Sequence, residues 1–281
     1  GESLEKRIVR VNTTPGDEFS VTPAAALPES CRLGCFITVK MTDANGAELG
    51  TLEERLPVKI INRENGEPLN ITDGEFEIKA EGEGFSYTLS KQTGFITSAL
   101  KNGSELLTAP MKLSYFRATT DNDRNVKAMW DRTNIWQGEN FDCAFNKVYS
   151  YRISGNRAEF TMSAAGVSRK PFFNYTLCYE FFTDGCVNVI LNGQIREKVV
   201  WLPRLGFEFK LPYDTSKFKY FGNGPMDSYR DMTHHGITAW HESDADREYV
   251  SYIRPQEHGN HYGCRELEIE NSLKFSAENL M

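Results

Sequence analysis

Apolar and polar residues alternate with a period of two along much of the chain. The clearest runs, with an apolar residue at every second position, are residues 31–41, 76–80, 85–89, 175–181, 207–211 and 267–269. Such runs are typical of strands that have one face against the core and the other in solvent. We therefore expect antiparallel sheets, with a short helix only within residues 127–136.

Turn signals separate these runs. Six Asx-Gly pairs occur along the chain: Asn45-Gly46, Asn65-Gly66, Asp73-Gly74, Asn102-Gly103, Asp184-Gly185 and Asn192-Gly193. Both residues of such a pair accept positive φ, so each pair predicts a tight hairpin. Strands joined in this way, without crossover helices, favour packed antiparallel sheets over an α/β barrel.

A boundary is predicted near residues 56–70, where a polar stretch contains a glycine and a proline. Residues 1–60 would form about half of an immunoglobulin-like β-sandwich, and residues 61–281 would form a second all-β domain. We expect the sequence to begin inside the first unit and to be truncated at its C-terminal end as well.

Composition removes several classes of function. The chain has 281 residues and a formal net charge of −7, with no basic stripe, so nucleic acid is not an expected partner. No apolar run is long enough to span a bilayer. Six cysteines are irregularly spaced without a CxxC pair. Cys31 and Cys35 fall on one strand face, so we expect free packing residues and leave the redox compartment open.

Three polar stretches interrupt the alternation, at residues 115–124, 220–231 and 252–267. Their notable positions are Arg117, Ala118, Asp121, Asn122 and Asp123; then Gly222, Gly224, Pro225, Tyr229 and Asp231; then Pro255, Glu257, Gly259, Arg265 and Leu267. In this order they resemble the R-A-P-x-D-N-D, G-x-G-P-x-E-x-Y-x-D and P-x-E-x-G…R-x-L motifs of the C-terminal module of family 2 β-galactosidases. Thr119 replaces the usual Pro and Asp227 the usual Glu. The likeness covers roughly residues 70–275.

The resemblance implies an antiparallel supersandwich, similar to galactose mutarotase, beside a TIM barrel that holds both catalytic glutamates. Retaining glycosidases need that pair about 5 Å apart, and no barrel is encoded here. The chain would therefore be a non-catalytic fragment of an enzyme that hydrolyses terminal β-D-galactosides, cytoplasmic or periplasmic in a bacterium. Its partners would be the TIM barrel and immunoglobulin-like domains of the parent chain and a β-galactoside sugar, with a homo-oligomer also open. The fragment needs no cofactor, while the parent would hold Mg or Na ions in its barrel.

The motifs contain the candidate site residues. Asp121, Asn122 and Asp123 could border the sugar pocket or bind a cation, but such residues also cap their own turns. Trp130 and Trp136 could stack on sugar rings or fill the core.

The remaining motif residues have structural interpretations. The segment from Gly222 to Pro225 predicts a tight turn. Asp227, Tyr229 and Asp231 would be polar anchors beside it. Glu257 and Arg265 are predicted to form a buried ion pair, so that Arg265→Ala should be destabilising.

Two other classes of function stay open. A stand-alone mutarotase-like epimerase would need Glu257 with His258 or His261 facing one pocket. A carbohydrate-binding module would need an exposed aromatic platform, from Trp130, Trp136 or Trp240. The other histidines, His234, His235 and His241, lack a zinc motif, and no metal site is predicted.

Overall fold

The computed structural model describes residues 3–12, 14, 16–132, 138–199, 201–212 and 216–277. Strands make up most of the regular structure of these residues, which confirms the all-β prediction. The helical elements described are η1 (Asp121–Asn125), α1 (Lys127–Trp130) and η3 (Phe141–Cys143). No helix among them combines the length and apolar composition that crossing a membrane requires.

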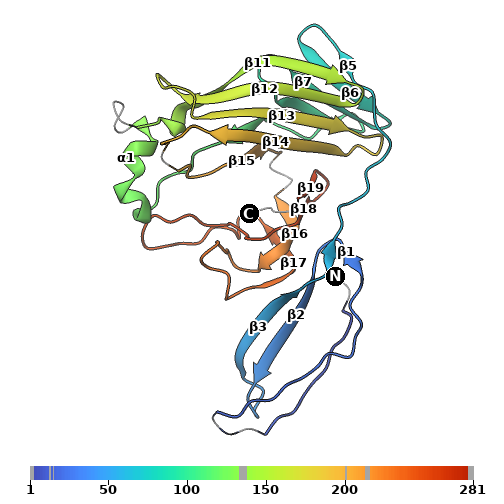
Figure 1. Cartoon of the computed structure of the whole chain (residues 1–281), viewed down its shortest axis with the longest axis vertical. Helices are drawn as coiled ribbons and strands as arrows, with labels where there is room; N and C mark the ends of the chain where they lie inside the picture. Colours follow the sequence, from blue (N-terminus) through green and yellow to red (C-terminus); the bar gives the residue numbers. More distant parts are fainter. Residues whose placement is uncertain are drawn as a thin grey trace.

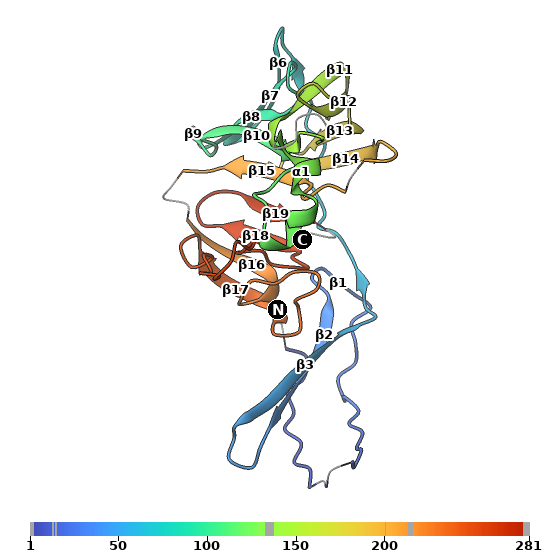
Figure 2. The same ribbon diagram turned by 90° about the vertical axis from the view of Figure 1, so that its left-hand side faces the viewer.

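Two antiparallel sheets stack face to face in the upper body of the molecule (Figure 1). One consists, in order, of β5 (Thr72–Asp73), β6 (Glu77–Gly82), β7 (Phe85–Ser90), β8 (Ile96–Lys101) and β9 (Ser104–Glu105). The other consists, in order, of β11 (Ala144–Ser154), β12 (Arg157–Gly166), β13 (Phe173–Phe181) and β14 (Val187–Ile195). Turned by 90°, the two sheets are seen as separate layers (Figure 2). We call this pair the sandwich.

The main core lies between these layers because alternate residues of facing strands point into it. Phe160 and Leu177 of the four-stranded sheet are fully buried, as are Ile78 and Leu89 of the five-stranded sheet. Each such side chain contributes about 1.5–3 kcal/mol by leaving water. A hydrogen bond also joins the layers, since the hydroxyl of Tyr179 donates to the carbonyl of Gly94 at 2.9 Å.

Two smaller sheets lie below the sandwich (Figures 1 and 2). The first pairs β10 (Ala109–Ser114) with β15 (Gly206–Lys210). The second, which we call the lower sheet, has the order β17 (Ile237–Asp244), β16 (Lys217–Gly224), β18 (Glu266–Ile269) and β19 (Lys274–Ser276). Within it, a Cβ on Gly222 would lie 2.4 Å from the sulfur of Cys264, so only glycine fits where these segments meet.

The N-terminal segment forms an arm that extends from the lower sheet (Figure 1). Its hairpin pairs β2 (Cys35–Thr42) with β3 (Glu48–Leu56), and a short parallel ladder pairs β1 (Ser30–Cys31) with β4 (Lys59–Ile60). The arm touches the lower sheet through Phe36, whose ring lies 6.2 Å from that of Phe221. The carboxylate of Glu53 also accepts a hydrogen bond from the amide of Thr238 at 2.9 Å.

Three details of the strand prediction are wrong. Residues 31–41 do not form one strand, because Gly34 has a φ of +102° and breaks the run between β1 and β2. Phe76 lies outside β6 and is exposed. The pair Asn192-Gly193 lies inside β14 instead of in a turn, where Gly193 leaves room for the ring of Phe173.

One further turn prediction is wrong, because Gly222, Asn223 and Gly224 lie in β16 instead of forming a tight turn with Pro225. Asn65-Gly66 makes no hairpin, because it connects β4 and β5, which do not pair with each other. The remaining four pairs lie where two consecutive, paired strands are joined, with Asp73 as the last residue of β5. All six cysteines are free, as expected. The predicted helix within residues 127–136 corresponds to the single turn α1.

Candidate functional site

Arg117 lies at the point where the first and third polar stretches meet. It follows β10, and its guanidinium binds the Asp123 carboxylate through two nitrogens, at 2.6 and 3.3 Å. Its Nε lies 3.1 Å from Oε2 of Glu257. The side chain of Arg117 is mostly buried, and its planar fork can satisfy two carboxylates at once.

Asp123 is the buried residue of η1. Its carboxylate accepts hydrogen bonds from the amide and hydroxyl of Thr120 at 2.7 and 2.9 Å, which closes a capping box at the start of η1. Burial alone would raise the pKa of the Asp123 carboxyl. The bonds from Arg117 and Thr120 outweigh burial and lower that pKa below its ordinary value, so Asp123 is a carboxylate at neutral pH.

Asp121 joins the same two stretches a second time. Its amide donates to the carbonyl of Pro255 at 2.8 Å, and its carboxylate lies 3.1 Å from Nη1 of Arg254. Between the two aspartates, Asn122 is exposed. Of the three predicted residues, Asp123 is therefore a buried anchor, Asp121 is a half-buried bridge between the two stretches, and Asn122 faces solvent.

The prediction that Glu257 pairs with Arg265 is wrong. Among the pairs formed by described residues, Glu257 binds Arg117 at 3.1 Å and Arg204 at 2.6 Å. Arg265 instead begins the segment that docks on β16, its amide donating to the carbonyl of Phe221 at 2.8 Å. Sequence spacing missed Arg204 because it lies more than fifty residues before Glu257, in a stretch without a motif.

The second and third polar stretches interlock around Ser228, which is fully buried. Its hydroxyl donates to the carbonyl of Asn223 and accepts from the amide of Tyr262, at 3.2 and 2.9 Å. Its carbonyl accepts from the side-chain amide of Asn260 at 2.7 Å. These bonds hold the loop after β16 against the loop before β18.

The predicted polar anchors have different surroundings. Asp227 is buried and accepts a hydrogen bond from the hydroxyl of Tyr252 at 2.9 Å. Burial raises the pKa of Tyr229 well above its ordinary value, and the nearby charges of Glu257 and Asp227 add to this effect. Asp231 is exposed. The three motifs thus converge on the loops around Arg117 and Glu257.

The tryptophans differ in exposure. Trp130 is buried, with the guanidinium carbon of Arg117 5.8 Å from its ring centroid. Trp201, which the sequence did not single out, packs edge-on against Trp130 and is 64% exposed. Trp240 is half-buried against Phe221. Trp136 lies outside the described residues.

A shallow hollow lies beside these loops. Its lining consists of Phe116, Asp131, Arg132 and Asp142, and its volume is about 480 Å³. Nε of Arg132 is 2.8 Å from the Asp142 carboxylate, so the walls carry polar groups that are already oriented. Phe116, one of the lining residues, directly precedes Arg117 in the sequence.

The two histidines of the third stretch, His258 and His261, contact Glu248 instead of Glu257. Nε2 of His261 lies 2.8 Å from the Glu248 carboxylate, and Nδ1 of His258 lies 3.0 Å from the Glu248 carbonyl. The pairing of Glu257 with either histidine, which the mutarotase-like alternative would need, is not formed, because that carboxylate binds Arg117 and Arg204. Within the described ranges, no group of three or more His, Cys, Asp or Glu residues is arranged to hold a metal ion.

The chemistry available at this site is limited by its ion pairs. Asp123 and Glu257 both bind Arg117, and for Asp123 this contact favours the charged form. A general acid must carry a proton at the working pH, and a carboxyl with a lowered pKa such as Asp123 does not. The arrangement can fix loops and present an exposed amide and indole at its rim.

Comparison with known proteins gives consistent relatives. Residues 81–280 match the family described as Beta galactosidase small chain. A β-galactosidase from Actinobacillus pleuropneumoniae is 31% identical over 205 residues, which are 72% of this chain and 20% of that protein. One from Streptococcus thermophilus is 29% identical over 216 residues, 75% of this chain and 21% of that protein. The chain thus spans about a fifth of the length of the curated relatives it matches.

Proposed function

The chain belongs to the β-galactosidase small-chain family, and on this premise we propose that it is the non-catalytic part of a family 2 glycoside hydrolase that acts on terminal β-D-galactosides. In this proposal the loops around Arg117 form one wall of the sugar pocket. The reacting carboxylates lie on a TIM barrel elsewhere in the parent chain, together with any Mg or Na ion.

One observation carries this proposal. The two carboxylates at the convergence of the motifs, Asp123 and Glu257, both bind Arg117. A retaining glycosidase requires one carboxyl that is protonated and one that is free to attack the sugar. Asp123 has a lowered pKa and so is not the protonated carboxyl, and both carboxylates are engaged by arginines instead of being free to attack. This favours a structural role for these residues over a reacting one.

The rim of the site supports contact with sugar. Asn122 offers a donor and an acceptor to hydroxyl groups. Trp201 offers an exposed indole face, and aromatic rings of this kind pack against the apolar CH face of a sugar. The exposed apolar residues of the arm also support packing of the remainder of the parent chain against this piece.

The test uses the whole enzyme that contains this chain. We expect Asn122→Ala to raise KM for a nitrophenyl β-galactoside several-fold with little change in kcat, since a positioning contact is lost but the reacting groups stay. Asn45→Ala, an exposed amide at the tip of the arm hairpin, is the matched control. Unchanged KM in Asn122→Ala and in Trp201→Ala would contradict the pocket-bordering role.

The mutarotase-like alternative loses its residue support, because Glu257 pairs with two arginines. A polarimetric assay of α-galactose with the 281-residue chain separates the two functions. We expect interconversion of the anomers at the rate of buffer alone.

A further inference from the structure

The outer face of the sheet β11–β14 carries a continuous strip of uncharged polar side chains. Cross-strand pairing aligns Ser163 with Asn174 and Asn174 with Gln194. The next row aligns Thr176 with Thr161 on one side and with Asn192 on the other. These side chains alternate with those of the sandwich core, so they point away from it. Ser163 is itself buried, with its hydroxyl against that of Tyr149, whereas Asn174, Asn192 and Gln194 are exposed.

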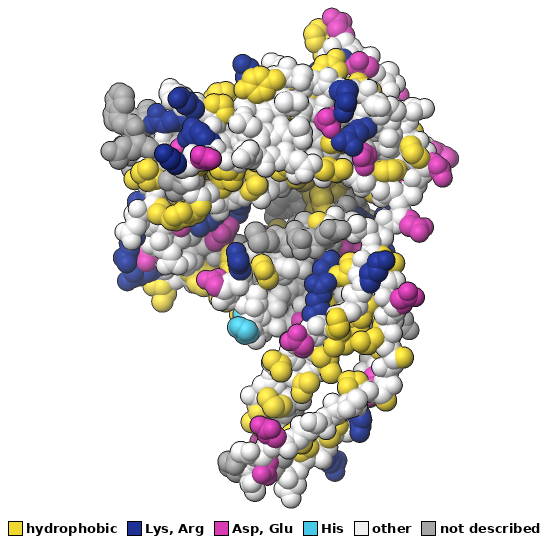
Figure 3. Space-filling view, in the orientation of Figure 1, with side chains coloured by type: hydrophobic (Ala, Val, Ile, Leu, Met, Phe, Trp, Pro, Cys, Tyr) yellow, Lys and Arg dark blue, Asp and Glu magenta, His cyan; other side chains and the backbone are white. Residues whose placement is uncertain are grey.

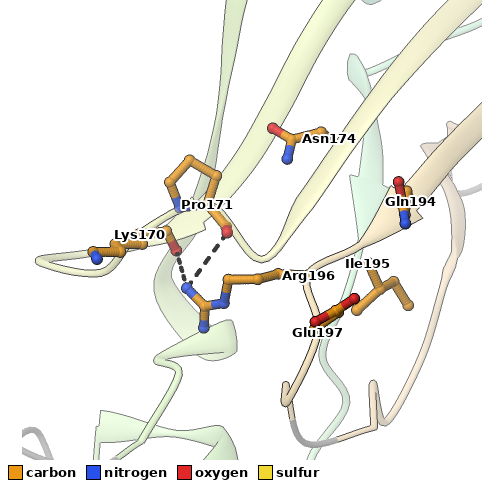
Figure 4. A pocket seen from close by; sticks show the side chains of 7 residues that line it. All are labelled: Lys170, Pro171, Asn174, Gln194, Ile195, Arg196 and Glu197. Atoms are coloured by element: carbon orange, nitrogen blue, oxygen red, sulfur yellow. Dashed lines mark hydrogen bonds between the residues drawn. The ribbon is translucent and has the colours of Figure 1, made fainter.

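A shallow groove lies over one end of this strip (Figure 4). It has a volume of about 440 Å³ and is lined by Lys170, Pro171, Asn174, Gln194, Ile195, Arg196 and Glu197. Its floor is held in place because Nη1 of Arg196 donates to the carbonyls of Lys170 and Pro171, at 3.3 and 3.4 Å, and Nη2 binds Glu139 at 2.6 Å. The side-chain amides of Asn174 and Gln194 are exposed.

Aromatic rings border the opposite edge of the face, on β11. Phe145 is 51% exposed and Tyr149 is 55% exposed. The Tyr149 ring leans over the face, since its hydroxyl lies 2.9 Å from that of Ser163. Lys147, between them, has its ammonium 5.1 Å from the Tyr149 ring centroid.

The charges near the strip are mostly neutralised by one another. Arg157 binds Glu159 at 2.7 Å and Glu180 at 3.2 Å, and Arg152 binds Glu159 at 3.3 Å. In the space-filling view, charged side chains gather toward the two ends of the upper body and leave a largely uncharged middle (Figure 3). Lys147 and Lys170 make no ion pair with another described residue, but they lie singly at opposite edges of the face. The face therefore fits a neutral ligand better than a polyanion, which is bound by clustered cations.

We propose that this face binds a neutral oligosaccharide chain, at a site separate from the loops around Arg117. The amides and hydroxyls of the strip would bond to sugar hydroxyls, and the rings of Phe145 and Tyr149 would pack on CH faces. Four strands spaced by about 4.8 Å give the strip a width of about 14 Å. It therefore accommodates several linked sugars and would discriminate against a single one. The proposal does not depend on the proposed function.

The experiment is calorimetric titration of the 281-residue chain with β-1,4-linked galactotetraose, with galactose as the short probe. We expect saturable binding of the tetraose, at least about tenfold tighter than galactose. Phe145→Ala and the double variant Asn174→Ala/Gln194→Ala should each weaken binding by about fivefold or more. Phe76→Ala and Gln92→Ala are matched controls, being an exposed phenylalanine and an exposed glutamine elsewhere, and should bind as the unaltered chain does.

Four results would overturn the proposal. They are the absence of saturable tetraose binding, binding that the two face variants leave unchanged, equal loss in the matched controls, and preferred binding of polygalacturonate that weakens with salt. Far-UV circular dichroism and melting of each variant show that the fold is retained. A fifth result that would overturn the proposal comes from light scattering. A dimer that Phe145→Ala dissociates would mean that the face binds a second copy of the chain instead.

Discussion

The sandwich and the N-terminal arm are built from strands with similar alternation, but they differ in what covers the apolar face. In the sandwich, Phe160 and Leu177 are fully buried against the facing sheet. In the arm, Val39, Met41 and Leu52 are between 47% and 65% exposed. Among the described residues, the arm hairpin is a two-stranded sheet of its own. Alternation thus sets which residues share a face, while stabilisation depends on a second layer.

The largest expected effect comes from truncating the sandwich core. Phe160→Ala should lower the free energy of unfolding by about 3–5 kcal/mol, since a fully buried ring is replaced by a cavity. Val39→Ala in the arm should change it by less than about 0.5 kcal/mol, as for most exposed positions. Urea unfolding of both variants measures the difference. Comparable losses in the two would mean that the arm face is covered in solution.

The same contrast shows what the sequence could predict. Alternation identified the strands that carry Ile78, Leu177 and Phe207, because a period of two is a local property. Alternation failed at Gly34, where the outcome depended on the backbone angle, and the Asx-Gly turn signal failed at Gly193, where it depended on a neighbouring ring.

The residues of the candidate site were likewise only partly predictable from the sequence. The motifs singled out Arg117, Asp123 and Glu257 separately, and only the structure shows that Arg117 binds both carboxylates. Their partners Arg204 and Trp201 were missed, because tertiary contacts between distant segments leave no periodic signal. Trp136 lies outside the described residues, so its role stays a prediction.

The second prediction compares a buried ion pair with an exposed one. Arg117→Ala should cost about 2–3 kcal/mol, because it leaves the buried Asp123 carboxylate without its cation. Arg254→Ala, which removes an exposed partner of Asp121, should cost less than about 1 kcal/mol. Denaturant unfolding gives both values. Equal effects would show that burial does not decide the strength of these pairs.

The third prediction concerns pH. The pKa of Asp123 is lowered from its ordinary value of 3.8, so its carboxylate stabilises the fold above that pH. The contribution is lost as pH falls through the lower, folded-state pKa. We therefore expect Asp123→Asn to be less stable than the unaltered chain at pH 6, with the gap narrowing toward pH 3. A gap that stays constant over this range would mean that the charge of Asp123 is not what matters.

The smallest effect is expected in the arm. Leu52→Glu places a charge on a residue that is 65% exposed, and should alter the stability of the chain by less than about 0.5 kcal/mol. In the whole parent enzyme the same substitution should be clearly destabilising, provided that another part of the enzyme covers this face. Thermal melting of the chain and of the parent enzyme gives the comparison. An unchanged melting temperature in both would mean that the arm does not pack against the rest of the enzyme.

We propose above all that the loops around Arg117 border a sugar pocket without performing hydrolysis. The most direct measurement is release of nitrophenol from a nitrophenyl β-galactoside by the purified 281-residue chain. We predict no release of nitrophenol above the rate in buffer alone. Turnover that disappears in Asp123→Asn or Glu257→Gln variants which remain folded would contradict it.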